Sequence, residues 1–327
     1  MYKRRIYFRA DASSEIGYGH FIRTLALADM LKDDFDCTFF TQSPTIFQQK
    51  EVDKVCRLVS LPADDSHFNL FLEILCGNEI VVLDNYFFTT KYQQEIKNKG
   101  CKLVCIDDMH NKHFVADAVI NHSLGINEKD YSKETYTQLY LGLDYALLRK
   151  PFIESLPQYI SNKKNNDKYK VIVSFGGADK YGIADHISSE LACIEYIEEI
   201  YLVSPQKIAE FSNRKVTYLS HLSAEQMKNL FLLCNLAIIP SSTIMKEAIA
   251  CGIDILGGYF VDNQVNSYNQ FCKINAIKGF GDLSKKENRN NLIQFIKEGF
   301  VKELSLNKNI ISSSIVDKYI MLFKQLC

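Results

Sequence analysis

The residue with the clearest chemical potential is His20, which ends a glycine-containing loop near the N-terminus. A strand-like segment at residues 5–10 runs into a loop with Gly17 and Gly19, and the pattern predicts a helix that begins near His20. Backbone N–H groups at a helix N-terminus attract anions, and glycines let a ligand approach the backbone. The positive helix end also disfavours imidazolium, which would leave His20 mostly neutral near pH 7 and able to accept a proton. His20 is thus a candidate base, and a histidine that only caps the loop is an equally good interpretation of its position.

This loop does not match the dinucleotide-binding fingerprint. That fingerprint requires a third glycine three residues after Gly19, but this position is Ile22. We therefore do not expect a nicotinamide enzyme, and no cofactor is expected.

A second glycine turn follows the apolar segment 171–175. Gly176 and Gly177 end this segment, and a helix is predicted within a few residues. The turn could cradle an anion with its backbone N–H groups. A tight turn in which Asp179 caps the helix is an equally good interpretation.

A third turn follows the apolar segment 236–239. Ser241, Ser242 and Thr243 stand where a helix begins, and Glu247 lies one turn further on the same face as Thr243. Hydroxyl and amide groups at a helix start suit a diphosphate, and the carboxylate could accept both hydroxyls of a ribose. The alternative is that the hydroxyls only cap the helix.

Two other polar clusters follow strand-like segments. Residues 262–264 precede another predicted helix, and their side chains could reach the same cleft as the third turn. Residues 107–113 include Asp residues with His110 and His113, which could bind a metal. Because these histidines sit in a loop with no fixed face, we favour a turn at the carboxyl end of a sheet, and no metal site is expected.

The elements that must hold these turns alternate between strand and helix. The predicted strands are 5–10, 37–41, 80–83, 102–106, 171–175, 199–203, 216–218, 236–239 and 254–256. The predicted helices are 21–32, 92–99, 183–191, 224–233, 245–251, 290–297 and 310–326. Such alternation predicts βαβ units and parallel sheets, hence an α/β fold.

The length of 327 residues suggests two domains. A polar segment without periodicity separates the two series of strands. We predict an N-terminal Rossmann-like domain at 1–155 that carries the histidine loop, a linker at 156–168, and a second Rossmann-like domain at 169–310. A terminal helix at 311–327 could pack on the N-terminal domain.

Composition excludes several classes of protein. The formal net charge is -1, so a broad nucleic-acid surface is not expected. No apolar run is long enough to span a bilayer or to form a signal peptide. The ten cysteines form no C-x-x-C pair, and we expect them to be reduced core thiols of a cytoplasmic protein.

Taken together, the motifs resemble those of the UDP-2,4-diacetamido-2,4,6-trideoxy-β-L-altropyranose hydrolases of pseudaminic acid biosynthesis. The resemblance covers most of the chain up to about residue 270, in the family's order. It rests on Arg9-Ala10-Asp11, Ile16-Gly17-Tyr18-Gly19-His20-Phe21-Ile22-Arg23, Leu83-Asp84-Asn85-Tyr86, Ile106-Asp107-Asp108, the segment 141–149, Ser174-Phe175-Gly176-Gly177-Ala178-Asp179, Ser242-Thr243, Glu247-Ala248 and Asn263-Gln264.

The resemblance implies a GT-B fold, in which two Rossmann-like domains with parallel sheets face a central cleft. It also implies metal-independent attack of water at the anomeric carbon of a UDP-sugar, with release of UDP. By this resemblance His20 is the base that activates water, and Tyr86 and Asn263 lie near the reacting sugar and the phosphates. The remaining residues expected to bind substrate are Asp11, Gly17, Gly19, Asp84, Gly176, Gly177, Asp179, Ser242, Thr243, Glu247 and Gln264.

This sequence also departs from the family. Ser241 and Ser242 stand where many relatives have two glycines, Pro240 before them is unusual, and Asn85 replaces a frequent His or Ser. These changes concern the sugar more than the nucleotide. A UDP-sugar glycosyltransferase and a non-catalytic UDP-sugar-binding protein stay open as alternatives. The expected partners are the UDP-sugar and UDP, and we expect a monomer.

Overall fold

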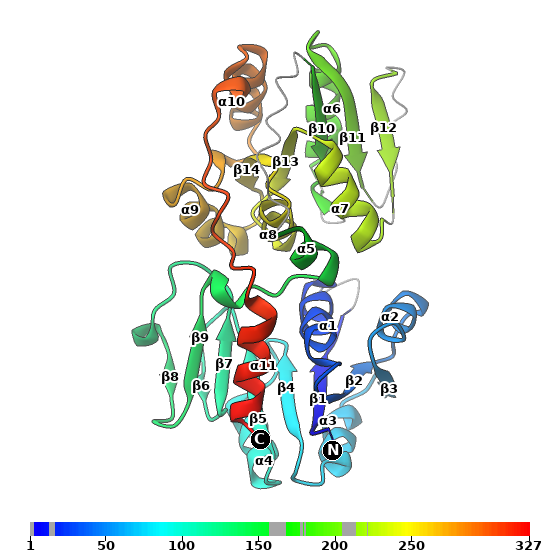
Figure 1. Cartoon of the computed structure of the whole chain (residues 1–327), viewed down its shortest axis with the longest axis vertical. Helices are drawn as coiled ribbons and strands as arrows, with labels where there is room; N and C mark the ends of the chain where they lie inside the picture. The colour runs from blue at the N-terminus through cyan, green and yellow to red at the C-terminus, as the bar shows by residue number, and fades with distance from the viewer. Residues whose placement is uncertain are drawn as a thin grey trace. The chain divides into compact units, whose positions relative to one another are not determined.

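The computed structural model describes residues 3–12, 17–156, 168–176, 179, 181–204, 214–220 and 222–327. The chain divides into two compact units (Figure 1). Unit 1 comprises Met1–Lys150 and Ser312–Cys327, and unit 2 comprises Pro151–Ile311. Apart from its two end residues, the predicted linker at 156–168 lies outside the described residues.

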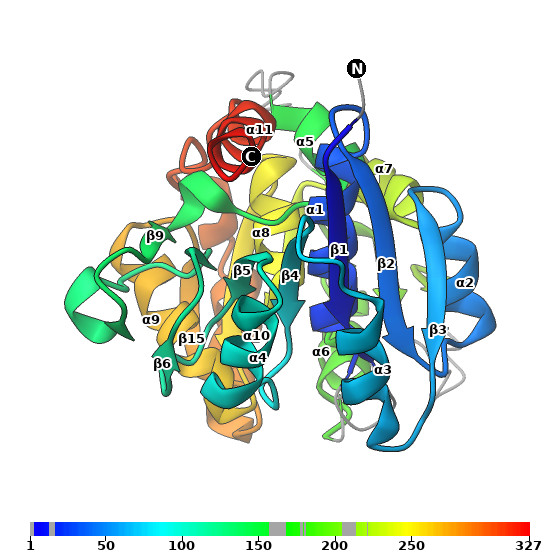
Figure 2. The ribbon, with the colours of Figure 1, turned by 90° about the horizontal axis from the view of Figure 1, so that it is seen from below.

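Unit 1 is built on a seven-stranded parallel sheet in the order β3-β2-β1-β4-β5-β7-β9. Figure 2 shows the first five of these strands side by side. The strands are β1 (Arg5–Ala10), β2 (Asp36–Gln42), β3 (Arg57–Leu61), β4 (Ile80–Asp84), β5 (Lys102–Ile106), β7 (Ala118–Asn121) and β9 (Gln138–Leu141). A small second sheet pairs β6 (His113–Phe114) with β8 (Ser132–Lys133).

Helices cover both faces of the unit 1 sheet. They are α1 (Gly19–Leu31), α2 (Ile46–Val52), α3 (Ser66–Ile74), α4 (Thr90–Asn98) and α11 (Ile315–Gln325). Neighbouring residues of β2 show the two faces, since successive side chains of a strand point to opposite sides. Phe39 packs on Phe21 of α1, whereas Phe40 packs on Phe71 of α3. Burial on both sides explains why β4 reads as a continuous apolar run.

The C-terminal helix α11 belongs to unit 1 although it follows unit 2 in the sequence. Its Tyr319 is fully buried and donates a hydrogen bond of 2.6 Å to the carbonyl of Tyr145. Phe323 packs against Phe35, which follows α1. This helix therefore completes the apolar layer on the α1 face.

Unit 2 has a six-stranded parallel sheet in the order β12-β11-β10-β13-β14-β15. Its strands are β10 (Tyr169–Val173), β11 (Ile197–Val203), β12 (Val216–Leu219), β13 (Leu236–Pro240), β14 (Asp254–Tyr259) and β15 (Lys278–Asp282). Its helices are α5 (Lys150–Ser155), α6 (Ile183–Ala192), α7 (Ala224–Leu233), α8 (Thr243–Ala250), α9 (Val265–Lys273) and α10 (Lys286–Lys297).

Both sheets have the same kind of switch point. In unit 1 the chain moves outward from β1 to β3 and then returns to place β4 on the other side of β1. In unit 2 the strands β10 and β13 are related in the same way. Ligands of open α/β sheets bind outside the carboxyl ends of the strands at such a point. The histidine loop and the serine turn both follow strands at these switch points.

The predicted strands all occur, with ends that differ by up to three residues, but several elements escaped prediction. They are β3, β6, β7, β8, β9, β15 and the helices α2, α3 and α5. Strand β15 has the sequence Lys-Gly-Phe-Gly-Asp, whose glycines argue against a strand. A Cβ atom at Gly279 would clash with Tyr268 and Cys272, so close packing by α9 requires this glycine.

Candidate active site

The candidate active site of unit 1 centres on His20, the second residue of α1. The preceding strand β1 ends at Ala10, so the fold brings His20 to the carboxyl edge of the sheet, next to the end of β4. The side chain is 7% exposed, and its Nδ1 lies 2.7 Å from Oδ1 of Asp84. The candidate base of the sequence thus has a carboxylate partner that its helical position alone did not reveal.

Asp84, the last residue of β4, is fully buried and receives several hydrogen bonds. Arg23 donates from Nε to Oδ2 at 2.7 Å and from Nη2 to Oδ1 at 2.6 Å, and Thr24 donates its hydroxyl to Oδ2 at 2.8 Å. Burial alone would raise the pKa of Asp84, but the charge and hydrogen bonds of Arg23, with a smaller contribution from His20, hold that pKa below its usual value. Asp84 is therefore a carboxylate that lies behind His20, where its oxygens are already used by protein donors. Asp84 is also among the residues that line the pocket, so its contact with substrate stays a prediction.

The ionised state of Asp84 assigns the tautomer of His20. A carboxylate can only accept, so the ring N–H at Nδ1 donates to Asp84. Nη2 of Arg23 lies 3.0 Å from the same Nδ1, and this Nη2 donates its N–H to the carboxylate of Asp84. In the neutral imidazole this assignment places the lone pair on Nε2, the atom that can take a proton. The tautomer of His20 is thus inferred from the hydrogen-bond network.

Arg23 joins this pair to a second carboxylate. Its Nη1 donates to Oδ2 of Asp108 at 2.9 Å, and the hydroxyl of Tyr86 donates to the same oxygen at 3.3 Å. The ring of Tyr86 meets the ring of His20 edge to face, with centroids 4.6 Å apart and planes at 87°. Burial, followed by the nearby charge of Asp108, raises the pKa of Tyr86 to about 12, so its hydroxyl stays protonated. The expected sugar-side residue Tyr86 thus lies directly beside the candidate base.

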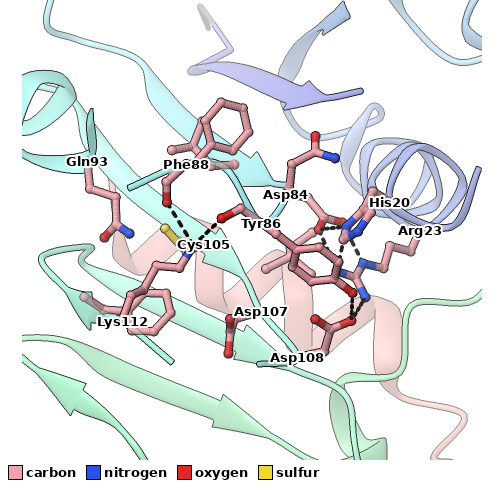
Figure 3. Close-up of a pocket in the computed structure, with 14 residues that line it drawn as sticks. His20, Arg23, Asp84, Tyr86, Phe88, Gln93, Cys105, Asp107, Asp108 and Lys112 are labelled. Atoms are coloured by element: carbon pink, nitrogen blue, oxygen red, sulfur yellow. Dashed lines mark hydrogen bonds and ion pairs between the residues drawn. The ribbon is translucent and has the colours of Figure 1, made fainter. Parts of the chain in front are cut away.

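These residues line one pocket of unit 1, drawn in Figure 3. His20, Arg23 and Asp84 lie together on one side, with Tyr86 and Asp108 next to them. The full lining is His20, Arg23, Leu83, Asp84, Asn85, Tyr86, Phe88, Gln93, Cys105, Ile106, Asp107, Asp108, Lys112 and Phe114. The pocket therefore combines a candidate base with several groups that can bond hydroxyl or amide groups of a ligand.

Lys112 fixes the loop that carries Tyr86. Its Nζ donates to the carbonyls of Tyr86 at 2.9 Å and Phe88 at 3.0 Å. Sequence reasoning gave no role to Lys112 or Thr24, and it quoted Arg23 and Asp108 only as parts of motifs. The spacing of His20 and Arg23, three residues apart on one helix face, is a signal that could have paired them.

Asp11 connects the ends of three strands. Its Oδ1 forms an ion pair with Arg9 and accepts hydrogen bonds from the Thr41 hydroxyl at 3.2 Å and from the backbone of Gln42 at 2.7 Å. The backbone N–H of Asp11 donates to Oδ1 of Asn85 at 2.7 Å, and Nδ2 of Asn85 donates to the Asp11 carbonyl at 3.2 Å. Asp11 is 2% exposed. Its contacts position the loops around the pocket.

The two glycines of the histidine loop differ in conformation. Gly17 has a φ of 76°, which an L side chain rarely adopts, whereas Gly19 begins α1. A Cβ atom at either position would meet no heavy atom of the described residues within 4 Å, the chain neighbours aside. The left-handed φ of Gly17 therefore favours glycine at this position.

The Asp-His cluster after β5 forms local contacts. His113 lies within hydrogen-bonding distance of Ser132 and Glu134, and Asp107 accepts a hydrogen bond of 3.0 Å from the Tyr131 hydroxyl. Within the described ranges, no group of three His, Cys, Asp or Glu residues is placed to hold a metal ion. Asp107 also accepts from the backbone N–H of His110, as in the turn interpretation of the sequence.

In unit 2, the glycine turn after β10 is described only in part. Gly176 has a φ of 70°, and Gly177 lies outside the described residues. The carboxylate of Asp179 accepts hydrogen bonds from the backbone N–H groups of Ile183 at 3.0 Å and Ala184 at 2.9 Å. Asp179 thus caps the start of α6, the second of the two interpretations of its position.

The serine turn after β13 leads directly into α8. Ser242 is the N-cap residue of this helix, yet its side chain makes no capping hydrogen bond. The hydroxyl of Ser241 is buried and has no hydrogen-bond partner in the described part of the chain, and Ser241 is 2% exposed. Thr243 is the first residue of the helix, and Glu247 lies one turn later with 4% exposure. The interpretation that these hydroxyls only cap the helix does not apply to Ser242.

The last expected pair lies between β14 and α9. Asn263 is exposed in a short 3-10 helix, Asp262–Gln264. Gln264 is buried, and its Oε1 accepts a hydrogen bond of 3.1 Å from the backbone N–H of Phe260. Gln264 therefore shapes the turn, while the amide of Asn263 is open to a ligand.

Comparison with known proteins agrees with the motifs. No family model matches the sequence. The UDP-2,4-diacetamido-2,4,6-trideoxy-beta-L-altropyranose hydrolase of Campylobacter jejuni is 25% identical over 82% of this chain and 96% of its own length. The spore coat polysaccharide biosynthesis protein SpsG of Bacillus subtilis is 25% identical over 91% of each chain.

Solved structures share the whole fold at low sequence identity. MurG of Acinetobacter baumannii superposes with a TM-score of 0.64 at 11% identity, over 98% of this chain and 99% of its own. HepE of Anabaena, solved with UDP and glucose, gives 0.60 at 13% identity, over 98% of each chain. No helix in the described ranges is long and apolar enough to cross a membrane. The chain is therefore similar over most of its length to the sugar-nucleotide hydrolase of Campylobacter jejuni, in agreement with its motifs, and its α/β fold is of the GT-B type.

Proposed function

We propose that this protein is a hydrolase that cleaves a UDP-linked deoxyamino sugar at the anomeric C–O bond, giving free sugar and UDP. The relation to the Campylobacter hydrolase and to SpsG supports a role in nonulosonate or surface polysaccharide biosynthesis of the pseudaminic acid type. One observation carries the proposal more than any other. His20 lies in a pocket with its Nδ1 bonded to a buried carboxylate, so that Nε2 is free to accept a proton.

The chemistry follows from that arrangement. Nε2 of His20 takes a proton from water, and the water oxygen forms a bond to the anomeric carbon as the C–O bond to UDP breaks. General base catalysis of this kind contributes roughly 10²–10⁴-fold to a rate. Asp84 holds the imidazole in the required tautomer and stabilises the imidazolium that forms, and Tyr86 packs against the ring edge to face. Asn263 is proposed to contact the sugar or the phosphates.

The leaving group is assigned to unit 2. UDP carries charge after the bond breaks, and backbone N–H groups at a helix N-terminus can stabilise it without a metal. We assign this role to the start of α8, where Ser242 makes no side-chain capping bond and Thr243 follows, and we assign the ribose to Glu247. HepE of the same fold was solved with UDP and with UDP-glucose, which supports a UDP ligand for this fold.

A glycosyltransferase is the second candidate, since MurG shares the fold. In that case a hydroxyl of an acceptor replaces water, and His20 takes its proton. A non-catalytic UDP-sugar-binding protein is the third candidate. The same pocket would then bind the sugar without turnover.

One experiment separates the hydrolase from the other two candidates. The purified protein is mixed with a panel of UDP-sugars in the absence of any acceptor, and UDP release is measured together with the free sugar by NMR. The hydrolase releases both products stoichiometrically, and the His20→Ala variant releases neither. Stabilisation by a UDP-sugar in a thermal shift assay without release would instead favour the transferase or the binding protein.

A further inference from the structure

The pocket contains two charged side chains, Arg23 and Asp108, in addition to the His20–Asp84 pair. A carboxylate bonded to Nδ1 suffices to set the tautomer of the base. Here the same carboxylate also pairs with Arg23, through Nε and Nη2, and Arg23 pairs in turn with Asp108. The guanidinium is itself only 3.0 Å from Nδ1 of His20.

We infer that Arg23 lowers the proton affinity of His20 by neutralising the charge of Asp84. We also infer that Asp108 weakens this effect, because its carboxylate partly neutralises the charge of Arg23. Arg23 is thus a positioning residue that adjusts the working pH of the base. The inference rests on the proposed function only where activity is the readout. The protonation of His20 can be measured without a substrate.

The electrostatic reason is simple. An unpaired carboxylate within hydrogen-bonding distance would favour the imidazolium and shift the titration of a histidine upward by about 1–3 pH units. A guanidinium at a similar distance acts in the opposite direction. Because His20 and Asp84 are both almost excluded from solvent, water screens neither interaction well. The protonation of the base therefore depends on the balance of these charges.

The groups that face His20 come from each neighbouring element. Arg23 comes from its own helix α1, Asp84 from β4, Tyr86 from the loop after β4, and Asp108 from the loop after β5. Tyr86 stays neutral, so it contributes no charge. Two further charged residues, Asp107 and Lys112, line the pocket, but their side chains bond to Tyr131 and to backbone carbonyls rather than to His20, Arg23 or Asp84. Among the described residues, the charges bonded directly to His20 or to its charged partners are therefore those of Asp84, Arg23 and Asp108.

Two variants test the inference with opposite expected signs. Arg23→Gln leaves Asp84 uncompensated, so the titration of His20 should move to higher pH by about 1–3 units. Asp108→Asn leaves the full charge of Arg23 beside the imidazole, so the titration should move to lower pH. Arg23→Lys keeps the charge and should stay within half a unit of the wild type, on the order of the small shifts expected for an equal charge.

The readout is the pH titration of the His20 ring nitrogens by ¹⁵N NMR, with the signal assigned by its absence in His20→Gln. The acidic limb of kcat/KM, where UDP release is measurable, should shift in parallel. Opposite shifts in Arg23→Gln and Asp108→Asn support the inference even if the protein lacks hydrolase activity. Unchanged titration in both variants overturns it.

Arg23→Gln removes the partner of a buried carboxylate and could prevent folding. Asp108 has a partly exposed side chain, at 25%, so Asp108→Asn is the safer variant. The direction in which the titration of His20 shifts in Asp108→Asn then tests the inference by itself. A shift to lower pH supports the inference, and no shift or a shift to higher pH refutes it.

Discussion

Nδ1 of His20 lies 2.7 Å from Oδ1 of Asp84, a residue 64 positions away in the sequence. The contact joins the first turn of α1 to the carboxyl end of β4, the two elements that meet at the switch point of the unit 1 sheet. It gives the imidazole a fixed tautomer and leaves Nε2 as the atom that can accept a proton.

Replacement of His20 should abolish turnover but not nucleotide binding. His20→Ala removes the base, so kcat for UDP release should fall by roughly 10²–10⁴-fold. The affinity for UDP, measured by calorimetry, should stay within about twofold, because we assign UDP to unit 2. Near-normal turnover in this variant would rule out the role of His20.

Replacement of Asp84 should reduce both catalysis and stability. Asp84→Asn can present its amide N–H to Nδ1, which favours the wrong tautomer, and it leaves Arg23 without its buried partner. Breaking a buried pair costs about 3–5 kcal/mol, and the residual folded protein should show a kcat lowered by roughly 10²-fold or more.

Glu79 offers a matched control for that variant. It is also a fully buried carboxylate, and it directly precedes β4, whereas Asp84 ends the same strand. Its Oε2 accepts hydrogen bonds from the backbone N–H groups of Cys76 and Gly77. Glu79→Gln should lower the midpoint of urea unfolding but leave kcat of the folded protein unchanged. An equal loss of kcat in both variants would show that Asp84 acts through stability alone.

The stability of the protein should depend on Asp84 at acid pH. The pKa of Asp84 is lower in the folded protein than the value of about 3.9 for an unfolded chain. Its contribution is therefore present above about pH 4 and is lost as the pH falls through the folded value. Between pH 4 and 2, the free energy of unfolding should fall less steeply in Asp84→Asn, by up to ~1.4 kcal/mol per pH unit. Urea unfolding at several pH values measures this slope, and identical slopes would contradict the expectation.

Glu247 should contribute to nucleotide affinity. We expect Glu247→Ala to weaken UDP binding about tenfold, as loss of one or two hydrogen bonds of a charged acceptor predicts. Calorimetry with UDP and with uracil measures the difference, since only UDP has the ribose and the phosphates. Glu225→Ala removes an exposed carboxylate paired with Lys228 on α7 of the same unit and serves as the control. Unchanged UDP affinity in Glu247→Ala would exclude the ribose contact.

The ring and the hydroxyl of Tyr86 should have separable effects. Tyr86→Phe keeps the edge-to-face contact with His20 and loses only the hydrogen bond of 3.3 Å to Asp108, so kcat should change by less than about fivefold. Tyr86→Ala removes the ring and should lower kcat much further. The ratio of the two effects is read from UDP release at saturating substrate. Equal losses would show that the hydroxyl itself contacts the substrate.

The sequence by itself determined the class of fold and the position of its chemical loops. Apolar runs such as β4 and the glycines before His20 are local signals, so strand-to-helix turns could be located without a structure. Short or glycine-rich elements such as β9 and β15 gave no such signal, because their strand state depends on pairing with a neighbour.

Only the tertiary structure decided which polar residues meet. His20 lies in the first turn of α1, Asp84 ends β4 and Asp108 follows β5, and parallel pairing of β1, β4 and β5 places these three positions at one sheet edge. The sequence treated Asp84 as a ligand-binding residue, and the structure adds that it is bonded to Arg23 and to the candidate base His20. Spacing along a chain fixes contacts within one helix turn, but contacts between strands depend on their order in the sheet, which local patterns do not encode.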